Sequence, residues 1–288
     1  MHEWGVIELD LSFPEARGAR WGYLRPNGIL EPWTEYEVEA PVIWFHGAPC
    51  TGTLTISSEQ GYFTTMLPRP DTLWDGEGER MAYPAAAGSQ TAVWRDVRVR
   101  YGGFEAEEEL LPVDSDPGGF GWAIPFWRRV DSNTITVPGS SYLDTFIYYE
   151  CTAGDIPGIV NDGPGGEDAW GYTGEALLFA PSGEEVTASL VTVDGTPEEV
   201  RRDLSRSDIL SVICNWGGDL KSIEILALWE TWEPAVRQRC VMGGEKVLIF
   251  PLTAEQTESV SRITFEPEDD QPVEYARLFL AMGAIGFI

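Results

Sequence analysis

The distribution of apolar residues predicts a mainly β protein organised around one strand at residues 38–46. In this segment Glu39 and Pro41 precede Val42-Ile43-Trp44-Phe45-His46, a run of β-branched and aromatic residues. Continuous apolar runs of this length, bounded by turn residues, are typical of strands that are buried on both faces. We therefore expect residues 38–46 to lie in the middle of a sheet.

Shorter segments on either side alternate between apolar and polar residues, which predicts strands with one face toward the core. They are residues 4–11 at the start of the chain, and residues 53–57 and 62–67 after the central strand. Because turn residues separate these last two segments from the central strand, we expect residues 38–67 to form an antiparallel meander.

The clearest alternation lies in residues 92–100, which predicts a strand with one buried and one solvated face. The two predicted faces are Val93, Arg95, Val97 and Val99 on one side, and Trp94, Asp96, Arg98 and Arg100 on the other.

The second half of the chain adds further strands. We expect a buried strand at residues 144–150 and a hairpin of residues 176–193 that turns at Pro181-Ser182-Gly183. Strands are also expected at residues 246–250 and 261–265, whereas residues 273–281 fit a short helix or a strand.

Two segments have helical signals. Thr196, Pro197 and the acids that follow have the residue types of a helix start, so we expect a helix from there to about Ser205. Residues 223–240 show helical spacing that is interrupted at Pro234, which predicts a helix with a kink or a restart.

Together these elements predict a β-sandwich or two packed antiparallel sheets, with a short helical insert near residues 196–240. Residues 1–193 would form a β-rich domain, and residues 194–288 would add the helical segment and the returning strands to the same core. For a chain of 288 residues, one domain and two domains are both admissible.

The charge of the chain restricts its partners. It has 47 acidic and 19 basic residues, a formal net charge of −28. The resulting negative field repels phosphate backbones and anionic lipid, so we expect no nucleic-acid partner. The longest apolar run, residues 278–288, is about half of the ~20 residues that a membrane helix needs, so we expect a buried terminal strand there and no membrane span.

Motifs in a fixed order along the chain resemble a family of uncharacterised bacterial proteins. The opening His2-Glu3-Trp4-Gly5 is similar to the family's His-Glu-Trp-Gly start, and residues 39–46 are similar to its Glu-Thr-Pro-Val-Ile-Tyr-Phe-Tyr strand. Similar motifs continue at residues 60–68, 94–99, 145–149, 228–232, 250–253 and 263–267. The family has no assigned function, so the resemblance implies none. His46 stands where the family has an aromatic residue, so a site built on His46 would belong to this protein and not to the family.

The opening residues lack the basic and apolar segments of a signal peptide. This favours a cytoplasmic protein if the chain starts there. The resemblance implies instead that the chain is a processed form, because members of the family commonly begin with an export signal; the protein would then lie outside the cell or in its envelope.

The only histidines, His2 and His46, are the first candidates for chemistry. Imidazole and carboxylate groups together suit zinc or a similar ion, so His2 would be joined by Glu3, by His46 or by an acid from a loop. Neighbouring residues on a regular strand point to opposite faces, which argues against a shared ion between His2 and Glu3. The alternative is a strand with Trp4 in the core and no metal.

Two glycine-rich acidic turns offer oxygen ligands of the kind that Ca²⁺ accepts. Neither turn matches the EF-hand pattern, and ordinary solvated turns are the alternative. The candidate ligands are Asp114, Asp116, Asp162, Glu167 and Asp168.

Four tryptophans in turn-rich places are candidate ligand-binding residues, because sugars stack on exposed indole rings, although Trp also fills cores. They are Trp74, Trp122, Trp127 and Trp170.

Recognised nucleophile motifs are missing from the sequence. No G-x-S-x-G elbow is present. Cys50 follows His46 by four residues on a Gly-Ala-Pro loop, and this spacing does not predict that the imidazole lies next to the thiol. The four cysteines, Cys50, Cys151, Cys214 and Cys240, form no C-x-x-C pair, and they would allow three disulfide pairings in an exported protein.

From these observations we expect a non-catalytic binding or assembly protein of the cell exterior or envelope, with a protein, a carbohydrate or a second copy of itself as partner. The alternative is a metal-dependent or carboxylate-based hydrolase. Perturbed carboxylates that converge in a concave pocket would favour the enzyme, and an exposed edge strand or a flat aromatic patch would favour assembly.

Overall fold

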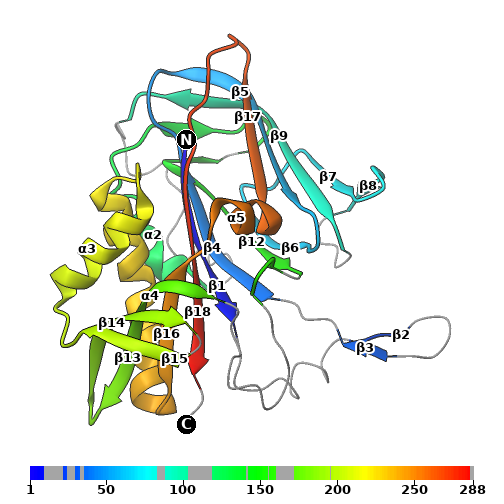
Figure 1. The fold of residues 1–288 in the computed structure, drawn as a ribbon. Helices are drawn as coiled ribbons and strands as arrows, with labels where there is room; N and C mark the ends of the chain where they lie inside the picture. Colours follow the sequence, from blue (N-terminus) through cyan, green and yellow to red (C-terminus); the bar gives the residue numbers. More distant parts are fainter. Residues whose placement is uncertain are drawn as a thin grey trace.

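The computed structural model describes residues 1–9, 22–24, 30–32, 36–82, 88–102, 119–140, 142–154, 156–159, 172–194 and 196–285. Within these residues the protein is mainly β and contains two large packed sheets, as the sequence predicts (Figure 1).

The larger sheet has nine strands among the described residues, in the order β15-β14-β13-β16-β18-β1-β4-β12-β6. The pair β1–β18 is parallel and the other pairs are antiparallel. Strands from the beginning, middle and end of the chain therefore share one sheet. The bounds are β1 (His2–Leu9), β4 (Tyr36–Trp44), β6 (Phe63–Leu67), β12 (Phe146–Ala153), β13 (Thr173–Ser182), β14 (Glu185–Asp194), β15 (Thr196–Arg201), β16 (Lys246–Pro251) and β18 (Ala276–Ile285).

The smaller sheet has seven described strands and lies against one face of the larger sheet. Its main order is β11-β10-β9-β5-β17, and β7 and β8 extend it from β9. The bounds are β5 (Cys50–Ser58), β7 (Thr72–Asp75), β8 (Arg80–Met81), β9 (Gln90–Arg100), β10 (Thr134–Thr136), β11 (Leu143–Asp144) and β17 (Arg262–Pro267); a separate pair is formed by β2 (Gly22–Leu24) and β3 (Leu30–Pro32).

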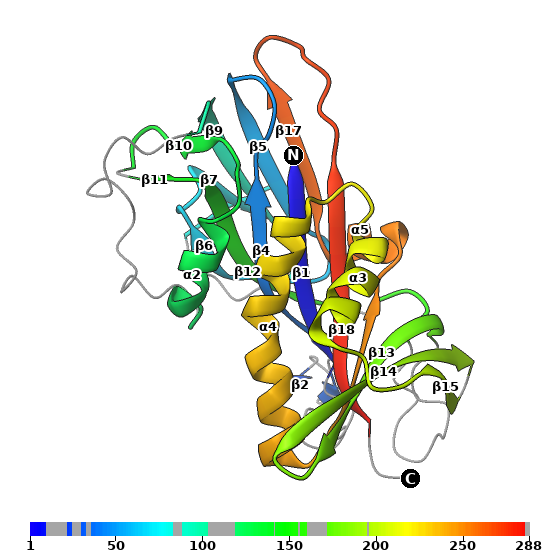
Figure 2. The ribbon, with the colours of Figure 1, turned by 90° about the vertical axis from the view of Figure 1, so that its left-hand side faces the viewer.

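Helices cover the opposite face of the larger sheet, where α4 runs along it with α3 and α2 beside it (Figure 2). The helices on this face are η2 (Gly121–Ala123), α2 (Ile124–Trp127), α3 (Arg206–Gly217) and α4 (Ser222–Gly243). Helix α5 (Ala254–Val260) contacts β17 and β18, and its Val260 packs with the smaller sheet. Within the described residues, no helix is both long enough and apolar enough to cross a membrane.

The core lies on both sides of the central strand β4, as its apolar run predicts. Val42 and Trp44 pack with the helices, whereas Ile43 and Phe45 pack with the smaller sheet. All four side chains are at most 4% exposed. The strand has a local irregularity at Ala40, whose φ is 49°, and its register to β1 shifts there. Alternation resumes beyond this bulge and sets which side chains face the helices.

The predicted meander of residues 38–67 is wrong. β5 follows β4 in the sequence but lies in the smaller sheet, and β6 returns to the larger sheet beside β12. Burial explains this separation: β4 needs neighbours that are covered on both faces, and β12, buried at every position, is such a neighbour. β5 buries alternate residues only, which suits a sheet with one covered face.

The predicted helix at residues 196–205 is also wrong. Thr196–Arg201 is the edge strand β15, which extends the confirmed hairpin of β13 and β14. An edge position tolerates Pro197, which has no N–H to donate. The helix α3 begins at Arg206, after Ser205, whose hydroxyl accepts a hydrogen bond from the backbone N–H of Asp208. The predicted helix over residues 223–240 is confirmed by α4, which continues through Pro234.

The strand at residues 92–100 is confirmed, but the predicted division of its faces is wrong. Trp94 is buried together with Val97 and Val99, whereas Arg95 is exposed. Asp96 has a φ of 53°, and the pairing with β5 shifts register at this place. A bulge therefore inserts one residue into the alternation and turns Trp94 toward the core.

Candidate functional site

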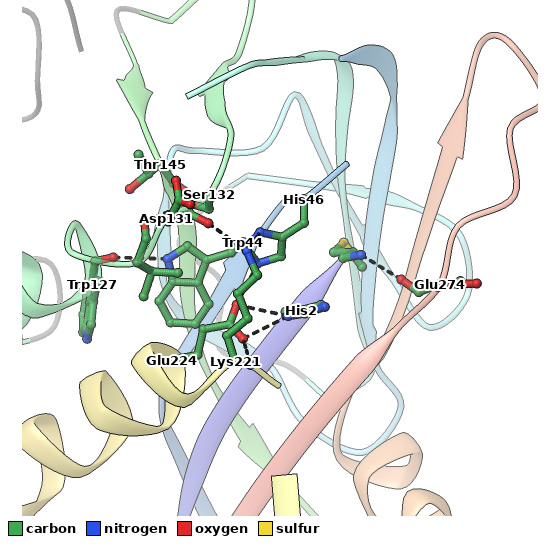
Figure 3. Close-up of polar contacts among 12 residues, drawn as sticks. His2, Trp44, His46, Trp127, Asp131, Ser132, Thr145, Lys221, Glu224 and Glu274 are labelled. Atoms are coloured by element: carbon green, nitrogen blue, oxygen red, sulfur yellow. Dashed lines mark hydrogen bonds and ion pairs between the residues drawn. The ribbon is translucent and has the colours of Figure 1, made fainter. Parts of the chain in front are cut away.

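The pairing of β1 with β4 brings the two histidines together. His2, at the start of β1, lies opposite Trp44 at the end of β4. Residues that pair across a sheet point to the same face, and so do residues two apart on an extended chain, so His46 follows Trp44 onto the face of His2. The two imidazole rings have centroids 4.4 Å apart and meet at an angle of 59° (Figure 3).

Helix α4 supplies the third member of the site, Glu224, from its first turn. The backbone N–H of Lys221 donates to Glu224 Oε2 over 2.6 Å, which ties the carboxylate to the helix start. A negative charge there is favourable because the free N–H groups of the first turn carry partial positive charge. The Glu224 side chain is 0% exposed.

Both histidines point at this carboxylate (Figure 3). His2 Nδ1 lies 2.9 Å from Glu224 Oε2 and 3.1 Å from Oε1, and His46 Nε2 lies 2.7 Å from Oε1. Lys221 Nζ lies 3.0 Å from His46 Nδ1 and donates over 2.9 Å to the carbonyl oxygen of Asp131. We refer to His2, His46 and Glu224 as the His-His-Glu cluster.

The buried carboxylate is held in its charged form. Burial by itself raises the pKa of Glu224, but the hydrogen bonds from His2 and His46, the charge of His2 and the N–H of Lys221 outweigh it and lower the pKa to about 2. The cluster is therefore a fixed anionic centre with two nitrogen donors next to it.

The segment that carries His46 is fixed by residues outside the cluster. Asn133 donates from its backbone N–H to Phe45 O over 2.8 Å and from its side chain to Gly47 O over 3.0 Å. The indole N–H of Trp44 donates to Trp127 O over 3.2 Å. The position of the imidazole thus does not depend on the carboxylate alone.

A cavity of about 320 Å³ opens beside the two histidines, which form part of its wall. Glu224 is not part of this wall and lies behind the imidazole rings. The remaining wall comes from the start of β5 and from the connection between β17 and β18; its residues are Met1, Phe45, Gly47, Ala48, Cys50, Val99, Phe265, Pro267, Gln271, Pro272, Val273 and Glu274.

The cluster has the donor set and spacing of a metal site. Its candidate ligand atoms all lie within 4.8 Å of one another, and within the described parts of the chain no other group of three such residues does so. Ligands at 2.0–2.1 Å from a tetrahedral zinc ion are about 3.4 Å apart, so the present N···O contacts of 2.7–2.9 Å would have to widen by about 0.5–0.7 Å to admit an ion. Two histidines and one carboxylate with a fourth position toward a cavity is a known arrangement of catalytic zinc.

Glu3 does not join this site, in agreement with the strand alternation. It points to the other face of β1, where it accepts hydrogen bonds from Tyr149 Oη over 2.7 Å and from Arg277 Nε over 2.6 Å. Tyr149 and Arg277 also contact the hydroxyl of Ser261. This buried network joins β1, β12 and β18. Of the pair His2 and Glu3, only His2 therefore lies on the side of α4.

The structure brings together the two histidines that the sequence singles out, and the tryptophan candidates among the described residues lie elsewhere. Trp74 is half-buried in β7, and Trp122 is 47% exposed. Trp127 is fully buried and donates to Thr231 Oγ1, so it has no face for stacking on a ligand. The candidates Asp114, Asp116, Asp162, Glu167, Asp168 and Trp170 lie outside the described residues.

The cysteines do not form a second catalytic pattern. All four are free, with Cys151 and Cys240 buried. Cys50 borders the cavity with His46, but burial and the negative charge of Asp269 raise the pKa of its thiol, which disfavours the nucleophilic thiolate.

Sequence reasoning missed Glu224. The available signal is its place in the predicted helix: it precedes Ala227 and Leu228 by three and four residues, and both are buried. An acid on the apolar face of a helix needs a partner, because an unpaired buried charge is costly.

Comparison of the chain with protein-family models, with curated proteins and with solved structures gives no match. The function is therefore argued from the geometry of the site.

Proposed function

We propose that the protein is a metal-dependent hydrolase in which His2 Nδ1, His46 Nε2 and Glu224 hold a zinc ion or a similar divalent ion. One observation carries the proposal: the only two histidines of the chain, both in the wall of a cavity, converge on a fully buried carboxylate behind them. The alternative, a hydrogen-bonded clasp without an ion, uses the same contacts and is decided by experiment.

The surroundings of the cluster fit a bound cation. Glu224 supplies a negative charge that burial would otherwise disfavour, and a divalent ion would compensate this buried charge. With an ion on His46 Nε2, the remaining imidazole proton would reside on Nδ1, so Lys221 Nζ, which now lies 3.0 Å from Nδ1, would move away and keep only its hydrogen bond to Asp131 O.

The position of the cavity favours a catalytic over a structural site. Structural zinc sites use four protein ligands, whereas catalytic sites keep one position for water or substrate. Here three candidate ligands converge and two of them, His2 and His46, border the cavity, so a fourth position would be left for water or substrate. Bound zinc lowers the pKa of its water to about 7, which provides a hydroxide near neutral pH.

The reaction supported best is hydrolysis of a carboxylic ester or amide. The water oxygen would bond to the carbonyl carbon, the C–O or C–N bond would break, and the leaving alcohol or amine would take the proton. Phosphate esters fit less well, because the chain carries a formal charge of −28 that repels polyanions.

The first test is elemental analysis of protein purified without chelators or affinity tags. We expect one zinc ion per chain, its loss in His46→Gln and Glu224→Gln, and its retention in the control Glu233→Gln, which changes a partly exposed acid on the same helix. Hydrolysis of a neutral p-nitrophenyl ester should follow the same pattern and be restored by zinc after chelation.

Two results would contradict the proposal. If the protein contains no divalent metal and binds no added zinc, the His-His-Glu cluster is a hydrogen-bonded contact without an ion. Stoichiometric iron would point to redox chemistry, because two histidines and one carboxylate also hold iron(II) in oxygenases.

A binding protein without catalysis is the second candidate, and an aromatic patch favours it. Trp122 is 47% exposed, and its ring centroid lies 6.4 Å from that of Phe120 and 6.0 Å from that of Phe126. Exposed aromatic side chains of this kind bind apolar partners or sugar rings. Titration of soluble oligosaccharides against wild type and Trp122→Ala would test it, and equal or absent binding would exclude this patch.

A further inference from the structure

The cavity beside the His-His-Glu cluster has a size that suits a small organic molecule. Its volume of about 320 Å³ lies at the lower end of the range of 300–1,000 Å³ that is typical of ligand sites. Its wall combines the ends of β1 and β4, the start of β5 and the residues that connect β17 to β18. A ligand in the cavity would therefore lie against the two histidines.

Much of the wall is apolar. The rings of Phe45 and Phe265 pack edge to face with centroids 4.9 Å apart, and both are at most 5% exposed. Val99 is buried in the same wall, and Pro267 and Val273 extend it. An apolar group that packs against this wall is removed from water, which favours binding.

The charged groups around the cavity are mainly negative. Glu274 lines it, and the charge of Asp269 is felt at Cys50, another wall residue. No Lys or Arg occurs among the described wall residues. The basic groups of this wall are the imidazoles of His2 and His46 and the amino group of Met1, which donates to the carbonyl oxygen of Glu274 over 2.7 Å. Away from the two histidines, an acidic substituent would therefore lie near Glu274 with no Lys or Arg side chain of the described wall to pair with.

We infer that the cavity selects neutral or cationic substrates with a compact apolar group, so that the hydrolysed compound is an ester or amide without an acidic substituent. The apolar group would lie against Phe45 and Phe265, and the carbonyl would face His2 and His46. This inference rests on the proposed function, because the cluster is what makes the cavity reactive.

The test uses matched hydroxamates, which chelate zinc, on the zinc-loaded protein. Benzohydroxamate provides the apolar ring, its para-trimethylammonium and para-carboxylate derivatives add opposite charges, and acetohydroxamate lacks the ring. We expect the neutral and cationic ring compounds to bind at least tenfold more tightly than the carboxylate derivative and than acetohydroxamate, as measured by calorimetry.

Two variants separate the apolar wall from the charge. Val273→Phe, in the connection that borders the cavity, should fill the space and weaken benzohydroxamate while leaving acetohydroxamate unchanged. Glu274→Gln removes an exposed charge and should reduce the preference for the cationic over the anionic compound. Equal binding of the two charged compounds, or equal binding of the two uncharged hydroxamates, would overturn the inference.

A parallel measurement on chelator-treated protein separates the two ideas. Benzyltrimethylammonium and benzoate need no metal, and NMR titration should show binding of the cation and not of the anion. If the cation binds but added zinc does not, the cavity is a ligand site and the hydrolase proposal fails. If zinc binds but neither aromatic ion does, the metal site stands and the assignment of substrate class is refuted.

Discussion

Replacing Glu224 with Gln should change how the stability of the metal-free protein depends on pH. The carboxylate has its pKa lowered to about 2 from an ordinary value of 4.5. Each unit of pKa corresponds to 1.36 kcal/mol, so the charged form of Glu224 stabilises the folded protein by about 3 kcal/mol near neutral pH. Because the pKa is depressed on folding, this contribution is complete above pH 4.5 and is lost as the pH falls toward 2.

The expected difference in the free energy of unfolding between wild type and Glu224→Gln follows from these two pKa values. It is about 3 kcal/mol at pH 7 and falls to about 1 kcal/mol at pH 3. Urea unfolding in the presence of a chelator, at several pH values between 7 and 3, measures it directly. The matched control Glu233→Gln lies on the same helix, but its side chain is 43% exposed and paired with Arg206, so it should cost at most about 1 kcal/mol.

The reasoning fails if the difference between wild type and Glu224→Gln stays constant across this pH range. A constant difference would mean that the amide disturbs packing but that the charge of Glu224 has no special stabilisation. It would also remove the argument that His2 and His46 donate to an ionised carboxylate.

Two further substitutions test the frame around the site. Burial raises the pKa of Glu3, and the contacts from Arg277 and Tyr149 offset this only in part. Glu3→Gln should still destabilise the fold by about 3 kcal/mol, because the buried guanidinium of Arg277 would keep only the partly exposed Glu258 as an acidic partner. Tyr149→Phe should cost about 1 kcal/mol, because it removes only the hydroxyl contacts to Glu3 and Ser261. Equal losses in thermal unfolding would contradict the ion-pair argument. Gly61→Ala should destabilise by about 3 kcal/mol or prevent folding, since an added Cβ would lie 1.7 Å from Thr152 O; a loss under about 1 kcal/mol by urea unfolding would refute this contact.

Burial of individual strands was predictable from the sequence, whereas their neighbours were not. The apolar run at residues 42–45 depends only on local composition, and β4 is indeed buried on both faces. Its partners β1 and β12 come from distant segments, and β5, next in the chain, joins the other sheet. Local pattern records how much of a strand is covered but not which strand covers its edge.

The helix error shows the same limit. Thr196, Pro197 and two acids can start a helix, and nothing in that segment reveals that β14 offers a free edge beside it. The bulge at Asp96 is similar, since one residue with positive φ reverses the faces of a strand whose alternation looks regular. In both cases tertiary pairing overrides a local preference.

The site combines what sequence can and cannot show. Two histidines in an acidic chain are visible candidates, but their meeting requires the particular register in which His2 lies opposite Trp44. A slip of one residue would turn one imidazole to the opposite face, toward the smaller sheet, and leave the other with Glu224 alone. Glu224 itself is one of 47 acids, and its role depends on α4 placing its first turn over that end of the sheet. The cluster is thus encoded by strand register and helix position together, so variants that shift either one should abolish metal binding even when all three ligands are present.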